Sequence, residues 1–330
     1  MNYLYKLILL DYELFLVKIK ILFLKYFKFI FSRKKIEKIL INLSKRKGTH
    51  IEITPSIGCA MMCNYCPQLL ITSVSKNNKE KNKMDFNEFK LFVKNISAQT
   101  EIHWTGYTEP LLHKDFNKFV MYLHENNFKQ QISTTMHGYE ISQNFMSSFN
   151  KFTKVNFHLP DNKYLMKIKV SDTYLEKLEK AILFQAQMNK KNITFQVIGE
   201  DFEFRVKNLL NKLVEKNIIL KKNVLIQNFI ASRSDAINVD GLNFTHKTSI
   251  QSSNKKNKLF YCSDRRLNQA VMLPDGSLNI CCMDYSLSGI VGSIKDQHLN
   301  DVYSYNDEFN RAFVEGSYKP CTSCEYYKSI

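Results

Sequence analysis

The chain has 330 residues, of which 44% are hydrophobic and 24% charged, and its formal net charge is +16. This balance supplies enough core-forming side chains for one large domain or two ordinary ones, and it excludes a wholly disordered chain. Only 10 glycines and 6 prolines are present, which excludes collagen-like and low-complexity classes. The longest stretch without a charge, residues 53–75, contains two prolines and many polar residues, so an ordinary transmembrane helix is not expected.

Much of the positive charge lies in an N-terminal arm, residues 1–47, which holds 12 Lys and Arg against 3 Asp and Glu. A helical periodicity over residues 3–31 places the charged side chains on one half of a helix and leaves the other half apolar. The apolar half consists of Leu4, Ile8, Tyr12, Phe15, Ile19, Leu22, Phe23, Tyr26 and Ile30. The pattern predicts an interfacial anchor on an anionic membrane surface, with a helix packed on the protein body or on a partner as the alternative. Because the charge is concentrated in this apolar arm, nucleic acid is disfavoured as a partner.

From residue 50 onward, short apolar or β-branched segments alternate with helix-length segments. The strand candidates are residues 50–54, 101–105, 130–135, 154–159, 193–198 and 223–229. The helix candidates are residues 85–96, 114–126, 140–149, 171–189 and 203–216. The alternation predicts an α/β fold with parallel strands joined by crossover helices. Six units fall short of the eight of a closed barrel, so we expect a partial (β/α)6 TIM-like barrel or an open sheet, with ligands at the carboxyl ends of the strands.

Four regions follow from these patterns. After the arm (1–47), residues 48–244 form the predicted α/β core. Residues 245–259 are mostly polar and are predicted to be a linker. Residues 260–330 form a small cysteine-rich α+β region, in which Pro274-Asp275-Gly276 predicts a turn between two short strands.

Three cysteines, Cys59, Cys63 and Cys66, follow the first strand candidate with the spacing C-x3-C-x2-C. Cytosolic thiols at such spacing are metal ligands more often than disulfides. A structural zinc needs a fourth ligand from elsewhere in the chain. Alternatively, the three thiols hold a cubane iron–sulfur cluster with one open iron.

With Tyr65 before its last cysteine, the motif resembles that of the radical S-adenosylmethionine (SAM) superfamily, and the likeness extends over residues 49–235. Gly106-Tyr107-Thr108-Glu109-Pro110, at the end of the second strand candidate, is similar to the glycine- and glutamate-containing motif that holds the SAM amino group in that family, although it is longer by one residue. The resemblance implies these SAM-binding residues: Tyr65, Gly106, Glu109, Thr134, Thr135 and Asp161. It also makes His158 a candidate catalytic residue that contacts the substrate.

A second group of cysteines comprises Cys262, Cys281, Cys282, Cys321 and Cys324. Adjacent cysteines rarely bind one metal together, so one of Cys281 and Cys282 is expected to be spare. The spacing resembles the SPASM/Twitch auxiliary-cluster region of radical SAM enzymes and implies one auxiliary [4Fe–4S] cluster. A zinc ribbon is the alternative. Asp284 is the candidate general base.

The resemblance implies an enzyme that reductively cleaves SAM to a 5′-deoxyadenosyl radical and abstracts hydrogen from a substrate, with the auxiliary cluster assisting oxidation. The expected substrate is a small molecule or a sugar or glycan precursor, and the expected reductant is a flavodoxin or ferredoxin. A peptide- or RNA-modifying enzyme and a non-catalytic iron–sulfur or zinc protein are the alternatives. Because oxygen-labile clusters need a reducing compartment, we expect a cytoplasmic protein at the inner face of the membrane.

Overall fold

The computed structural model describes most of the chain. The described residues are 19–26, 30–44, 50–77, 81–138, 140, 142–228, 230–234, 236–237, 258–262, 269–295, 297–304, 307–324 and 326–329. No helix among them is long and apolar enough to cross a membrane. Most of the predicted linker falls outside these ranges.

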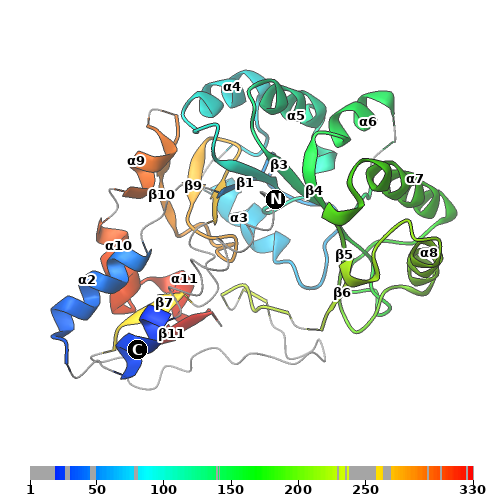
Figure 1. Cartoon of the computed structure of the whole chain (residues 1–330). Helices are drawn as coiled ribbons and strands as arrows, with labels where there is room; N and C mark the ends of the chain where they lie inside the picture. Colours follow the sequence, from blue (N-terminus) through cyan, green and yellow to red (C-terminus); the bar gives the residue numbers. More distant parts are fainter. Residues whose placement is uncertain are drawn as a thin grey trace.

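A nine-stranded sheet with the order β10-β9-β8-β1-β2-β3-β4-β5-β6 forms the centre of the structure (Figure 1). Its six parallel core strands are β1 (His50–Ile53), β2 (Glu101–Trp104), β3 (Gln130–Thr134), β4 (Phe152–His158), β5 (Ile193–Ile198) and β6 (Val224–Gln227). All six strand candidates and their parallel arrangement are confirmed.

The helices between these strands cover the sheet along one side (Figure 1). They are α4 (Phe86–Lys94), α5 (Phe116–Glu125), α6 (Gln143–Phe149), α7 (Asp172–Asn189) and α8 (Phe204–Glu215). Each lies within a helix candidate. In α8 the buried side chains Val206, Leu209, Leu210 and Leu213 recur at helical spacing, which explains why this segment folds against the sheet. Helix α3 (Gln68–Asn77), which begins two residues after Cys66, was not predicted from the sequence.

Part of the cysteine-rich region continues the core sheet. Strand β8 (Gln269–Met272) pairs in parallel with β1, and β9 (Ser277–Asn279) and β10 (Ile290–Ser293) extend the sheet in antiparallel fashion. Gly276, in the turn between β8 and β9, has φ +84°, a conformation that favours glycine. The predicted turn between two short strands is confirmed, and the pairing with β1 brings this region next to the first cysteine loop.

The rest of the C-terminal region forms a smaller unit with its own core. It contains the antiparallel pair β7 (Phe260–Cys262) and β11 (Tyr327–Ser329), with α10 (Asp307–Glu315) and α11 (Lys319–Thr322). Helix α9 (Leu299–Ser304) instead packs on the main core through Leu299 and Val302. Helix α2 (Arg33–Ser44) packs into the core of the smaller unit, which includes Ile36, Leu40, Phe260 and Phe313. Within the periodic segment 3–31, Leu24 packs in this core as well. Residues 1–18 of the arm lie outside the described residues.

Candidate active site

The first cysteine loop leaves the end of β1 and leads into α3. Cys66 N–H donates to the Cys63 carbonyl at 3.0 Å, which closes the C-x2-C turn. Gln68, which is buried, holds the loop from its other side: its Oε1 accepts from Cys59 N–H at 3.0 Å, and its Nε2 donates to the Cys66 Sγ at 3.2 Å. A second contact joins the Cys66 Sγ to the Tyr285 hydroxyl at 3.5 Å.

The three thiols lie near one another and are partly shielded from water. Burial raises the pKa of Cys59, and it raises that of Cys63 to about 11, with Cys66 adding to both shifts. Among the described residues, no three His, Cys, Asp or Glu side chains are close enough together to bind a single metal ion. In a cubane cluster each thiolate binds a different iron, so three thiols on one loop fit that donor set. The positive charge of bound iron would offset the cost of burying thiolates.

Glu109 lies in the loop that follows β2 and is buried. Its carboxylate is hydrogen-bonded to residues at the end of β3. Its Oε1 accepts from the Thr134 hydroxyl at 2.8 Å and from Leu111 N–H at 3.2 Å. Its Oε2 accepts from the backbone N–H and the hydroxyl of Thr135, at 2.7 and 2.8 Å. Burial raises the pKa of Glu109 although these hydrogen bonds oppose the shift. Four protein donors match the roughly four lone-pair positions of a carboxylate. A contact of Glu109 with the SAM ammonium group stays a prediction.

Gly106 and Tyr65 line the same end of the sheet. Gly106 has φ +89°, and a Cβ there would lie 2.0 Å from the Thr54 Oγ1, so only glycine fits this close approach. The buried ring of Tyr65 faces that of His158, with 5.8 Å between ring centroids. His158 Nε2 is buried and has no hydrogen-bond partner in the described structure. Burial and then the charge of Arg233 lower the pKa of His158 to about 4, so its ring is neutral near pH 7.

Asp161, two residues after Leu159 at the end of β4, is a loop-organising residue. Its buried carboxylate accepts from the N–H groups of Lys163, Leu165 and Met166 at 2.9, 3.0 and 2.8 Å. The loop so formed contacts the first cysteine loop, since Asn64 N–H donates to the Leu165 carbonyl at 2.9 Å. A direct contact between Asp161 and SAM stays a prediction.

The loop after β9 carries Cys281, Cys282 and Asp284 to the same region. The Tyr107 hydroxyl lies 3.0 Å from the carbonyl oxygens of both Cys281 and Asp284, and it accepts from Asn279 Nδ2 at 2.7 Å. The carboxylate of Asp284, which is buried, accepts from the Ser286 hydroxyl at 2.6 Å and from Gly289 N–H at 2.7 Å. These contacts fix the loop beside the first cysteine loop.

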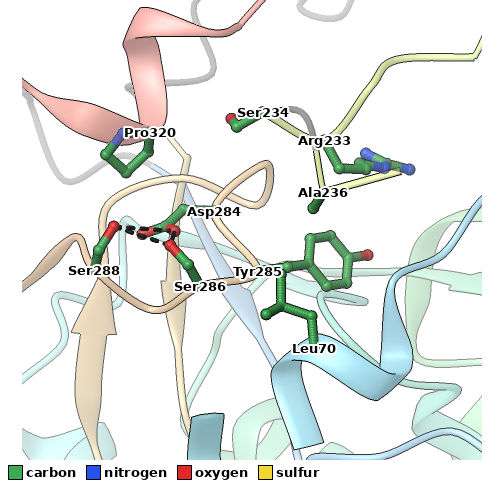
Figure 2. A pocket seen from close by; sticks show the side chains of 9 residues that line it. All are labelled: Leu70, Arg233, Ser234, Ala236, Asp284, Tyr285, Ser286, Ser288 and Pro320. Atoms are coloured by element: carbon green, nitrogen blue, oxygen red, sulfur yellow. Dashed lines mark hydrogen bonds between the residues drawn. The ribbon is translucent and has the colours of Figure 1, made fainter. Parts of the chain in front are cut away.

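A pocket of about 330 Å³ lies at this junction (Figure 2). Figure 2 shows the loop of Asp284, Ser286 and Ser288 on one side and the segment with Arg233 on the other, with Tyr285 between them. The lining residues are Leu70, Arg233, Ser234, Ala236, Asp284, Tyr285, Ser286, Ser288 and Pro320. Arg233 and Ser234 have φ of +53° and +57°, a costly conformation for residues with side chains that clusters at functional sites.

The C-terminal cysteines fall into two groups. Cys262, Cys321 and Cys324 pack in the core of the smaller unit, where Cys324 N–H donates to the Cys321 carbonyl at 3.1 Å, as in the first C-x2-C turn. A hydrogen bond with the Cys282 thiol and then burial raise the pKa of the Cys281 thiol, and the charge of Cys321 adds to the shift. The Cys281 Sγ also accepts from Met283 N–H at 3.4 Å. Cys282 packs with Cys66 around Tyr107 and Tyr285. The two adjacent cysteines are thus in contact with each other, and Cys282 also contacts the surroundings of the first cysteine loop.

Three residues of this site were not singled out from the sequence: Gln68, Tyr107 and Tyr285. Gln68 and Tyr285 carry no motif of their own. Tyr107 interrupts the glycine–glutamate motif, and this insertion was the available signal.

A family model matches the C-terminal region of the chain, and solved structures match most of its length. Residues 262–325 match the SPASM family model, described as an iron–sulfur cluster-binding domain. None of the curated proteins matches the chain significantly.

Three solved structures illustrate the structural likeness, and all three are of radical SAM enzymes with auxiliary cluster domains. Histidine-tagged anSMEcpe with bound AdoMet is 15% identical, with 83% of this chain and 85% of that chain covered and a TM-score of 0.50. BtrN in complex with AdoMet and 2-DOIA is 21% identical, with 84% and 92% covered and a TM-score of 0.48. Streptococcus suis SuiB bound to the precursor peptide SuiA is 13% identical, with 89% and 72% covered and a TM-score of 0.47.

At such identities the likeness concerns the fold. The chain therefore has the fold of the radical SAM enzymes and carries a SPASM iron–sulfur cluster-binding domain in residues 262–325.

Proposed function

We propose that this chain is a radical SAM enzyme that removes a hydrogen atom from a small molecule and oxidises the resulting substrate radical. The observation that carries the proposal is a pocket whose lining includes Tyr285, Asp284 and Pro320, which are neighbours of cysteines from both groups. Its wall residue Tyr285 contacts the Cys66 Sγ at 3.5 Å, and Asp284 follows Cys281 and Cys282 on the same loop. A substrate bound there would lie between the two redox sites.

Cys59, Cys63 and Cys66 would hold a [4Fe–4S] cluster that leaves one iron open. When bound, the cluster supplies the electron that breaks a sulfur–carbon bond of SAM and yields methionine and a 5′-deoxyadenosyl radical. The protein contributes a buried environment at the carboxyl ends of the strands, which excludes water. The proposed SAM contacts remain Tyr65, Gly106, Glu109, Thr134, Thr135 and Asp161, with His158 nearby.

The second site would hold the auxiliary [4Fe–4S] cluster through Cys262, Cys281, Cys321 and Cys324. Cys281 is preferred to Cys282 because the charge of Cys321 acts on its thiol, which also accepts an N–H···S hydrogen bond from Met283. In the proposed reaction, the substrate C–H bond breaks and its hydrogen atom joins the 5′-deoxyadenosyl radical. Asp284 would take the proton that the substrate radical loses as a new double bond forms, and the auxiliary cluster, when bound, would supply the acceptor for the electron.

The pocket supports a small, hydroxylated substrate. Its volume of about 330 Å³ is at the lower end for small-molecule sites, and Arg233, Ser286 and Ser288 supply hydrogen-bonding groups. A sugar or glycan precursor has this size and chemistry, and the Arg233 guanidinium suits a substrate with an anionic group. A peptide substrate is the second candidate, because the matched anSMEcpe and SuiB have also been crystallised with peptides.

Anaerobically reconstituted protein is expected to contain about eight irons and to form 5′-deoxyadenosine from SAM under dithionite. A deuterated small-molecule substrate should transfer its label to that product. Arg233→Gln should raise the substrate KM about tenfold, as expected for one lost charged hydrogen bond. The matched control Arg205→Gln, on α8 and paired with Asp172, should not.

Other outcomes would contradict the proposal. Zinc without iron would favour a non-catalytic binding protein. Label transfer from a peptide or RNA, and from no small molecule, would reject the proposed substrate class.

We also propose that the arm attaches the enzyme to an anionic membrane surface, where a flavodoxin or ferredoxin would reduce it. In the helical residues 19–26, Leu24 is buried against the smaller unit, whereas Leu22 is 55% and Phe23 47% exposed. The exposed stripe, together with the excess of basic residues in the arm, fits an interfacial helix with lysines at its sides.

Flotation with vesicles tests this attachment. The wild-type chain should float with vesicles that contain phosphatidylserine and far less with neutral vesicles. Leu22→Ser/Phe23→Ser should reduce flotation by roughly tenfold or more, because about 3 kcal/mol of apolar burial is lost. The control Leu69→Ser, at a residue that is 73% exposed on α3, should float like the wild type. Equal flotation of all three proteins would reject the membrane proposal.

A further inference from the structure

Gln68 is a buried polar side chain that contacts both the first cysteine loop and the glycine–glutamate motif. It lies at the start of α3, its side chain is 3% exposed, and it makes three polar contacts. Its Oε1 accepts from Cys59 N–H at 3.0 Å. Its Nε2 donates to the Tyr107 carbonyl at 2.7 Å and to the Cys66 Sγ at 3.2 Å. The side chain thus joins two cysteines of the first loop to the glycine–glutamate motif.

These partners fix the orientation of the amide. The reverse orientation would place the amide oxygen against the Tyr107 carbonyl and the Cys66 sulfur, and the NH₂ group against Cys59 N–H. Every polar atom of Gln68 would then face a group of its own kind. An N–H donor therefore points at the Cys66 sulfur, and the burial of Gln68 keeps water from competing with it.

We propose that Gln68 is a positioning residue that sets the reduction potential of the cluster held by Cys59, Cys63 and Cys66. The inference rests on the proposed function. Reduction adds negative charge to a cluster and its thiolates, so a donor aimed at the Cys66 sulfur stabilises the reduced form and raises the potential. The acceptor contact to Cys59 N–H holds the loop while this happens.

The same side chain connects the first cysteine loop to the second. Gln68 Nε2 binds the backbone of Tyr107, whose hydroxyl lies 3.0 Å from the Cys281 carbonyl. The Tyr107 ring packs edge-on against Tyr285, with 4.7 Å between centroids, and the Tyr285 hydroxyl is the second contact of the Cys66 sulfur. Tyr285 should therefore have a smaller effect of the same sign, because its contact is longer.

Redox titration of the holoenzyme, followed by electron paramagnetic resonance, tests the proposal. The signal that changes on addition of SAM identifies the cluster concerned. Gln68→Leu removes all three contacts at similar volume. It should shift the equilibrium toward the oxidised form about tenfold, which is 59 mV toward negative values for one electron. Tyr285→Phe should shift it less in the same direction, and the exposed control Leu69→Gln should not shift it.

The Gln68→Glu variant separates the effect of the amide N–H donor at the Cys66 sulfur from that of the amide oxygen at Cys59 N–H. It keeps an acceptor for Cys59 N–H but turns a carboxylate toward the Cys66 sulfur, so its potential should be lower than that of Gln68→Leu. If Gln68 acted only through Cys59, this variant would match the wild type, and the proposal would be overturned. Should Gln68→Leu fail to load iron, the potential of Gln68→Glu decides alone. Unchanged potentials with intact SAM cleavage would reject this inference only, whereas absence of a SAM-responsive cluster would reject the proposed function.

Discussion

Replacing Cys63 with alanine is expected to reduce SAM cleavage by about a thousandfold or more, equivalent to at least ~4 kcal/mol in transition-state free energy. The reason is the small number of ligands. Three thiols on one loop are the whole protein contribution to the proposed cluster, so two cannot hold it firmly. Iron analysis of the anaerobically reconstituted variant should show a loss of about four irons, with the auxiliary site still loaded.

The C-terminal cysteines provide the matched comparison. Cys281→Ser should also lose about four irons but should keep SAM cleavage, because the first site is intact. Cys282→Ser should keep both its iron and SAM cleavage, since Cys282 packs beside Tyr107 and Tyr285 and is not a proposed ligand. If Cys282→Ser lost iron and Cys281→Ser did not, the assignment of these two residues would be reversed. If Cys63→Ala cleaved SAM at the wild-type rate, the radical mechanism would have to be given up.

The six parallel strands were predictable because each is a short apolar or β-branched segment and helix-length amphipathic segments separate them. The packing of α8 illustrates this, since its four buried residues recur at the period that the sequence displays. Helix α3 was missed because its sequence QLLITSVSKN is rich in β-branched and hydroxyl side chains, which carry no strong helical signal. Its position is set by tertiary contacts, among them those of Gln68.

The joining of the two cysteine groups could not be predicted, because it depends on pairing between distant segments. His50 of β1 pairs with Gln269 of β8, more than 200 residues later, and no local pattern indicates that partner. The cysteine motifs identified the metal-binding residues, whereas the contacts of Gln68 and Tyr285 with the Cys66 sulfur follow only from the folded arrangement.

Removing the carboxylate of Glu109 is expected to have the largest effect on stability. In Glu109→Ala, Leu111 N–H and Thr135 N–H lose a buried acceptor, and two threonine hydroxyls must find new ones. Each unsatisfied buried backbone donor costs about 1–3 kcal/mol, so the free energy of unfolding should fall by about 4 kcal/mol. Urea unfolding of the protein without SAM, under anaerobic conditions, measures this loss.

The absence of SAM from that experiment separates two roles of Glu109. If the residue only bound the SAM ammonium group, the unfolding free energy of Glu109→Ala would match the wild type and only SAM affinity would fall. If it joins the ends of β2 and β3, stability falls before any ligand is added. Thr135→Val, which removes one hydroxyl donor but keeps the backbone N–H, should cost only about 1 kcal/mol. Glu101→Gln, a change to a partly exposed carboxylate paired with His50 on the neighbouring strand, should cost still less. The order of these three losses follows from the number of buried hydrogen bonds that each change removes, so a different order would reject the joining role.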